Sequence, residues 1–200
     1  MARDNELIQI VDAALAEAVH KSGTWLACRP GCWECCRGPF PITQLDAQRL
    51  RDGLADLQTG DSARAERVRQ RVRHAVARLP AFPASMDDTE FEALLETLPE
   101  EEACPVLDPE TGACDLYSAR PLTCRVFGPA IRWGGDAVGV CELCFEGASA
   151  GEIAACEVQL DIADREEELV RAQEQSSGTH GPTLVALALV NMPARSPAST

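Results

Sequence analysis

Ten cysteines in a chain of 200 residues are the feature that most restricts how this protein can fold. So many thiols either build a disulfide framework or act as metal ligands. Residues 1–10 carry acidic side chains early and no continuous apolar run, so they do not resemble a secretory signal. Disulfides seldom persist in a reducing compartment. We therefore predict a cytoplasmic, metal-binding protein, with a disulfide scaffold as the alternative.

Charge and hydropathy narrow the range of partners. The formal net charge is −14 and the sequence pI is about 4.6, whereas proteins that bind the nucleic-acid backbone normally carry a basic surface. The longest apolar run, residues 183–190, is far shorter than the roughly 20 residues that span a bilayer. We expect no nucleic-acid partner and no membrane association, and the sequence leaves a protein partner open.

The cysteines form three groups and one isolated position. The groups are Cys28, Cys32, Cys35 and Cys36; then Cys104, Cys114 and Cys124; then Cys141 and Cys144; and Cys156 stands alone. A Cys-x-x-Cys segment can direct both sulfurs at one centre, and tetrahedral zinc needs four sulfurs at about 2.3 Å. Iron–sulfur clusters use the same thiolates. The histidines lie away from these groups, so cysteines alone are the simplest ligand set.

The predicted metal ligands come from all three groups. They are Cys28, Cys32, Cys35, Cys36, Cys104, Cys114 and Cys124, with Cys141 and Cys144 as a further pair. That further pair could instead be a redox couple. Because neighbouring side chains usually point in different directions, Cys35 and Cys36 could serve two centres, or one could support the other. Two metals and one polynuclear cluster both remain open, and Cys156 is expected to be a buried apolar residue.

Four arginines stand next to the cysteines in sequence: Arg29, Arg37, Arg120 and Arg125. Four thiolates around a divalent cation leave a net negative charge, which neighbouring guanidinium groups would offset. The alternative is that these residues are ordinary surface charges.

Apolar spacing and breakers predict the elements. We expect helices over residues 5–20, from Thr43 onward, over 62–79 and over 88–98, with an irregular stretch at 24–41. A hairpin is expected at 104–114, a short helix after Pro121, and a second hairpin with residues 134–136 at its tip. Ser149 and Glu152 predict a capping box that opens a long helix to about Gln173.

These elements define the expected architecture. We predict an α+β fold, mainly α-helical, with small β-hairpins around an irregular cysteine-rich metal site. Residues 1–175 form the predicted metal-binding domain, and residues 176–200 form an apolar C-terminal segment with a loose tail from Pro193.

Two segments carry a resemblance to a known family. They are CRPGCWECC at residues 28–36 and CPVLDPETGACDLYSARPLTCRVF at residues 104–127. Together they resemble the YkgJ-like cysteine-cluster family, and the resemblance spans roughly residues 25–145. It implies a domain that chelates zinc or iron. In the family pattern, Cys-x-x-Cys-x-x-Cys-Cys, the first cysteine precedes the second by three positions; here Cys28 precedes Cys32 by four.

Three functions are compatible with these features. The first is a protein that holds zinc or iron through cysteine thiolates. The second is an iron–sulfur redox protein or a component of a protein-modifying system. The resemblance implies this function because some members of the family are labelled iron–sulfur oxidoreductases and a related cysteine cluster is found in flagellin lysine methylases. The third is a zinc-stabilised adaptor that uses an arginine-bearing helix (Arg64, Arg67, Arg71 and Arg78) or a C-terminal apolar strand. The arginine face could equally be solvated. No catalytic residue is predicted, and whether the protein is an enzyme is left open.

Overall fold

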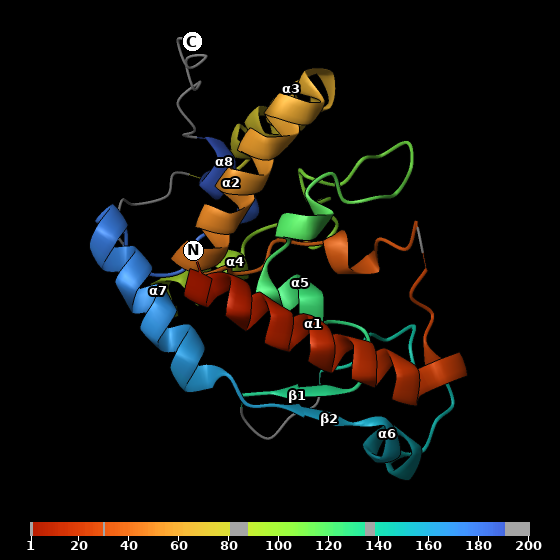
Figure 1. Cartoon of the computed structure of the whole chain (residues 1–200). Coiled ribbons are helices and arrows are strands. Elements are labelled where there is room, and N and C mark those ends of the chain that lie inside the picture. Colours follow the sequence, from red (N-terminus) through yellow and green to blue (C-terminus); the bar gives the residue numbers. More distant parts are fainter. Residues whose placement is uncertain (1, 30, 81–87, 135–138, 191–200) are drawn as a thin grey trace.

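The computed structural model describes residues 2–29, 31–80, 88–134 and 139–190. Helices dominate it, and a single pair of parallel strands supplies the sheet in the described residues. The predicted α+β class, mainly helical with a small β part, is therefore confirmed. The long helices form a frame, and irregular segments lie beside them (Figure 1).

Helix α1 (Ala2–Ser22) covers the small sheet. Its apolar face fully buries Leu7 and Val11, as the spacing over residues 5–20 predicts. Strand β1 (Ile131–Trp133) pairs in parallel with β2 (Val158–Leu160), and Ile131 lies opposite Val158. Figure 1 shows α1 running alongside both strands, and their apolar side chains form one core with those of α1.

Helices α2 (Gln44–Gly60), α3 (Ser62–Val76) and α8 (Val185–Val190) pack against one another around the largest core. Thr43 caps α2 by accepting a hydrogen bond from the backbone N–H of Asp46, so the predicted start at Thr43 is confirmed. The face of α3 that was expected to be apolar is buried through Ala65, Val68, Val72 and Ala75. The helix ends three residues before the predicted Leu79.

Shorter elements connect these layers. Helix α4 (Asp88–Leu95) lies within the predicted 88–98 segment, and α5 (Leu122–Val126) follows Pro121 as expected. Short 3-10 helices interrupt the described loops: η1 (Gly23–Trp25), η2 (Glu34–Cys36) and η3 (Tyr117–Ala119). In the stretch predicted as irregular, residues 24–41, the described residues form only η2, the end of η1 and one isolated bridge, from Arg37 to Ala103.

The single long helix predicted from Ser149 to Gln173 is wrong. The chain forms α6 (Ala150–Cys156), then β2, then α7 (Ala163–Ser177). The capping box of Ser149 and Glu152 is present and opens α6. Val158 and Leu160 are buried and Gln159 is exposed, so the period of two that defines a half-buried strand overrides the helical pattern here.

The hairpin expectations have mixed outcomes. Residues 104–114 turn back as predicted, with an antiparallel bridge between Leu107 and Cys114. The tip of the second expected hairpin includes residues 135 and 136, which lie outside the described residues. Ile131 does bridge Gly139 in antiparallel fashion, but the paired strand partner of β1 is β2, far along the chain.

The apolar C-terminal strand predicted as an adaptor element is also wrong. Residues 185–190 form helix α8, whose Val185, Ala188 and Leu189 are buried against α2 and α3. Periodicity cannot separate a short buried helix from a strand in so brief an apolar run. The expected tail from Pro193 lies outside the described residues. In the described parts of the chain, no helix combines the length and the apolar character needed to cross a membrane.

Candidate metal centre

The cysteine-bearing loops are joined by backbone hydrogen bonds. The N–H of Cys104 donates to the carbonyl of Cys36 at 2.7 Å, which brings the first and second cysteine segments together. The N–H of Phe145 donates to the carbonyl of Trp25 at 2.9 Å, which brings the third segment onto the first. In Figure 1 the segment that follows α1 rises along the right-hand side of the molecule before it enters α2. The first cysteine segment therefore contacts both the second and the third cysteine segments.

Five cysteines gather beside the largest core. We name them the inner sulfur group: Cys35, Cys36, Cys104, Cys114 and Cys124. Every pair among Cys35, Cys104, Cys114 and Cys124 interacts electrostatically, so these four thiols are mutual neighbours. The fifth, Cys36, is hydrogen-bonded to Cys35 through its thiol.

The protonation of the inner thiols follows from these contacts. The hydrogen bond from Cys36 lowers the pKa of Cys35 to about 7, and it raises the pKa of Cys36. Burial raises the pKa of Cys104 to about 12, and burial also raises the pKa of Cys114 and of Cys124. A metal binds thiolates and not thiols, so binding here must displace protons.

Two guanidinium groups offset negative charge at the inner group. Arg120 helps to lower the pKa of Cys35 and opposes the rise at Cys114, while Arg71 opposes the rise at Cys104. The prediction that Arg120 lies near the thiols is therefore confirmed. Arg71, on α3, was expected only as part of a solvated or docking face.

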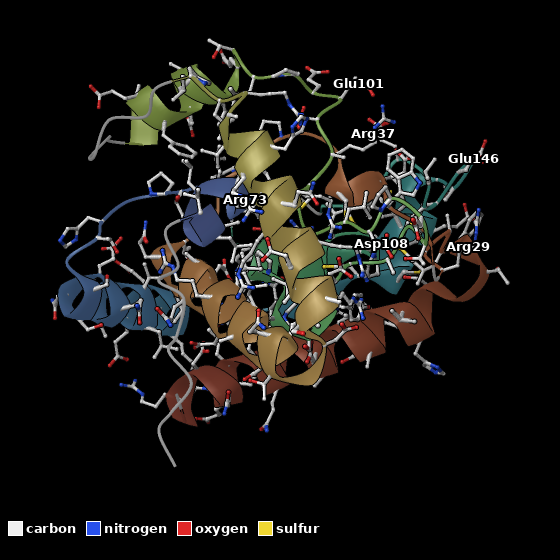
Figure 2. The ribbon with its side chains drawn as sticks, turned by 90° about the horizontal axis from the view of Figure 1, so that it is seen from above. Arg29, Arg37, Arg73, Glu101, Asp108 and Glu146 are labelled. Carbon is white, nitrogen blue, oxygen red and sulfur yellow. The ribbon has the colours of Figure 1, made fainter. Side chains whose placement is uncertain are left out.

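The other three arginines next to cysteines have different partners. Arg125 is buried and donates to Asp12 and to backbone carbonyls. Arg37 pairs with Glu34 and Glu101, and Figure 2 shows Arg37 and Glu101 as neighbours. Arg29 is exposed and donates to the carbonyl of Ala27 at 3.5 Å. These three arginines are structural or surface groups.

Asp115 anchors the inner group to α3, and sequence reasoning missed it. Its carboxylate is buried directly after Cys114 and accepts hydrogen bonds from Arg64 and Arg71. Arg78, just after the end of α3, pairs with Glu102. Three of the four arginines of the predicted face thus have partners within the chain, whereas Arg67 is exposed, and the adaptor hypothesis remains a prediction. The sequence did contain a signal for Asp115, because this residue directly follows the predicted ligand Cys114.

Four cysteines form a second gathering. We name Cys28, Cys32, Cys141 and Cys144 the outer sulfur group, because in sequence they flank the inner one. The Sγ atoms of Cys28 and Cys144 lie 3.9 Å apart. Desolvation of its sulfur, followed by the proximity of Cys144, raises the pKa of Cys28 to about 12, although the residue as a whole is exposed. Burial raises the pKa of Cys141.

Three thiols accept a hydrogen bond from the backbone N–H two residues ahead. The donors are Val106 to Cys104, Leu116 to Cys114, and Leu143 to Cys141. Each contact lowers the pKa of its thiol against the larger effect of burial, because it stabilises the thiolate. The same local turn thus recurs in both sulfur groups and suits sulfur that carries negative charge.

The predicted ligands divide between the two groups. All nine belong to one group or the other, and Cys28 and Cys32 lie with Cys141 and Cys144 instead of with Cys35. Cys156 is outside both; it is buried, as expected, and its Sγ donates to the carbonyl of Lys21 at 3.3 Å. Among the described residues, no three His, Cys, Asp or Glu side chains already stand in a metal-coordinating arrangement.

A cavity lies beside the inner group. Its volume is about 440 Å³, and Cys104 shares its lining with Arg71, His74 and Arg78. A smaller apolar cavity of about 100 Å³ adjoins Cys104 from the side of Phe40 and Leu184. Cys104 is therefore the member of the inner sulfur group that lines both of these cavities.

An all-sulfur donor set selects zinc, copper(I) or iron over hard cations such as magnesium. The fold and the two sulfur groups thus define a cysteine-rich metal-chelating domain. The sequence profile of a family described as "CxxCxxCC: Putative zinc- or iron-chelating domain" matches residues 27–145, more than half of the chain. The chain belongs to this family. The matched region begins next to Cys28 and ends next to Cys144, so it encloses both sulfur groups. No curated protein and no solved structure matches the chain.

Proposed function

We propose that this protein holds zinc or iron at the inner sulfur group through Cys35, Cys104, Cys114 and Cys124. The observation that carries the proposal is that each of these thiols interacts with the other three. Four thiolates are the full ligand set of a structural zinc site and of a [4Fe–4S] cluster. Cys36 supports the site through its hydrogen bond to Cys35.

The residues around the four sulfurs match such a centre. Four thiolates on a divalent cation carry a net negative charge, and Arg71 and Arg120 offset part of it. The amides of Val106 and Leu116 donate to two of the sulfurs, which fixes their orientation. Asp115 holds the turn that carries Cys114 against α3.

An iron–sulfur redox protein, or a component of a protein-modifying system, is the second candidate. The cavity beside Cys104 favours it, because a small molecule could approach a cluster there. Its lining by Arg71, His74 and Arg78 suits an anionic molecule. A purely structural zinc site has no need of such access.

The proposal also concerns the cellular setting. All ten cysteines are free thiols in the structure, which suits a reducing compartment such as the cytoplasm. The net charge of −14 opposes binding to nucleic acids and to anionic surfaces.

Elemental analysis and an absorption spectrum of protein purified without oxygen test the proposal. Iron with inorganic sulfide would favour the redox candidate, and zinc without visible absorption would favour a structural role. The variants C35S and C124S should lose the inner metal. C156S is the matched control, because Cys156 is buried outside both groups and should leave the metal content unchanged. Unchanged metal in both C35S and C124S would refute the assignment.

A further inference from the structure

Two sulfurs of the outer group are spaced like two ligands of one metal ion. Two sulfurs at about 2.3 Å from a tetrahedral zinc ion lie about 3.8 Å apart. The Sγ atoms of Cys28 and Cys144 are 3.9 Å apart, although the two residues are 116 positions apart in sequence. Cys28 also interacts electrostatically with Cys32 and Cys141, and Cys141 interacts with Cys32 and Cys144. Five of the six pairs within the group are thus neighbours.

The outer group is distinct from the inner one. The thiols that act most strongly on Cys28 and Cys141 all belong to the outer group. Those that act most strongly on Cys104 and Cys124 all belong to the inner group. In sequence the two groups are joined by the short link from Cys32 to Cys35, next to η2. Gly31, between Cys28 and Cys32, also packs against Gly112 of the turn between Cys104 and Cys114. One tetrahedral ion takes four thiolates, so a single mononuclear site would leave the remaining thiols unused.

Tight turns present the outer sulfurs. The N–H of Cys32 donates to the carbonyl of Arg29, and the N–H of Cys144 donates to the carbonyl of Cys141, each at 2.9 Å. The amide of Leu143 donates to the Cys141 sulfur. Both pairs of sulfurs are therefore held by local hydrogen bonds that do not depend on the inner group.

Gly128 makes room for the outer group. Its φ is +123°, and a Cβ placed on it would lie 2.9 Å from the Sγ of Cys28. Its carbonyl accepts the N–H of Cys141 at 3.3 Å. A residue without a side chain thus lies between Cys28 and Cys141, which keeps the space beside the Cys28 sulfur open.

The surroundings of the outer group are apolar but thinly supported. Cys141, Cys144 and Phe145 are buried, and Phe145 stacks on Trp25 with ring centroids 6.3 Å apart. Phe145 has a φ of 59°, the one positive φ at a non-glycine residue in the described chain, a conformation that crowds its Cβ against the backbone. Among the described residues, the α-helix that contributes to this cluster is the short α6. Such a strained, loop-built region needs a further source of stability.

From this geometry we propose that Cys28, Cys32, Cys141 and Cys144 form a second, separate metal site that takes a structural zinc ion. Structural zinc sites are closed and fully occupied by protein ligands, which fits four cysteines of which two, Cys141 and Cys144, are buried in an apolar cluster. The inference rests on the proposed function only for the chemistry of thiolate ligation, because the two sites share no residue. Zinc here would fasten residues 25–32 to residues 141–145.

Zinc titration of reduced, metal-free full-length protein tests the second site. The wild-type chain should bind about two zinc ions, as measured by elemental analysis after gel filtration. C28S/C144S should bind about half as much. C156S is the matched control, because Cys156 lies in the same apolar cluster outside the sulfur group, and it should bind as much as the wild type. Circular dichroism should show that the helices persist in C28S/C144S, and zinc retained at the inner group confirms its folding.

The outcomes separate the two sites. Equal zinc in C28S/C144S and the wild type would overturn the inference, as would an equal loss of zinc in C156S. If C28S/C144S loses all of the bound zinc while C35S/C124S loses none, the proposed inner site fails and the outer site stands. If C35S/C124S loses all of it and C28S/C144S loses none, the inner site stands and the outer site fails.

Discussion

The inner and outer sulfur groups lie close together in the chain but are built on different supports. Cys104 and Cys114 pack against the core that α2, α3 and α8 share. Cys141 and Cys144 pack in a small cluster of loop residues with α6 at its edge. Arg71 and Arg120 lower the electrostatic cost of thiolates in the inner group, whereas the strongest influences on Cys28 are desolvation and other thiols.

This difference indicates two ways of making a thiolate site. The inner group is supported by helices and balanced by cations, so its framework exists without the metal. The outer group depends on loops that only a few backbone hydrogen bonds connect, so we expect metal binding to contribute directly to its folding. Four predictions test this contrast.

Metal removal should have the largest effect, and it should fall on the outer group. After chelation, the amides of Cys144 and Phe145, which donate to Cys141 and Trp25, should exchange about 100-fold faster, because the ligand-free loops open locally. Amides within α2 and α3 should change much less. Hydrogen exchange followed by mass spectrometry measures both. Equal acceleration in the helices would remove the contrast between the groups.

Replacing Asp115 should damage the inner group selectively. D115N removes the charge that pairs with Arg64 and Arg71, and it should lower the free energy of unfolding by about 2–4 kcal/mol. The inner metal should bind more weakly, while the outer metal should be retained. The control is E101Q, since the Glu101 carboxylate is exposed and solvent screens its pair with Arg37, so this substitution should leave stability and metal binding nearly unchanged. Urea unfolding and metal titration provide the measurements, and a loss confined to the outer site would contradict the anchoring role.

Gly53 offers a test of the helix support. A Cβ at Gly53 on α2 would overlap the Cβ of Ala119 in η3, which lies between Cys114 and Cys124 in sequence. G53A should lower the free energy of unfolding by about 1–3 kcal/mol through overpacking and should weaken the inner site. G60A, at the end of the same helix with no atom near its Cβ, should change stability by less than about 1 kcal/mol in either direction. Thermal unfolding of the two variants measures this difference. Equal stabilities of G53A and G60A would show that η3 can shift to make room for the added methyl group.

The smallest effect concerns Glu166 on α7, outside both groups. Burial, and then repulsion from Asp46, raises its pKa from 4.5 to about 7. Because the folded state holds this proton more tightly than the unfolded chain, the free energy of unfolding should fall as pH rises from about 4.5 to about 7. After discounting for its partial exposure, the loss is about 1 kcal/mol. E166Q should remove this loss of unfolding free energy at pH 8, both in the wild type and in C28S/C144S. If the effect of E166Q differed between these two backgrounds, α7 would be coupled to the outer sulfur group.

Local chemistry made much of the fold predictable from sequence. Thr43 and Ser149 cap helices through contacts a few residues away, and the apolar face of α3 follows from its own spacing. The pairing of β1 with β2 could not be predicted in this way, because it joins strands separated by more than twenty residues and their register depends on packing under α1.

The cysteines show the same limit. Spacing identified which thiols could bind metal, but it assigned Cys28 and Cys32 to the same group as Cys35. The backbone bond between Phe145 and Trp25 carries the loop of Cys28 to Cys144 instead. Such a contact depends on tertiary structure, and no local pattern in residues 28–36 encodes it.

The long reach between Cys28 and Cys144 has a consequence for how this chain can change over evolution. Cys28 and Cys144 are 116 positions apart, and the segment between them contains α2, α3, α4 and the whole inner group. The entropy of closing a flexible loop grows only with the logarithm of its length, so doubling the enclosed chain costs about 0.6 kcal/mol more. Insertions in exposed connections of the enclosed segment should therefore leave the outer closure almost as favourable as before. The interior of the closed segment is free to lengthen and diversify while its two ends remain fastened.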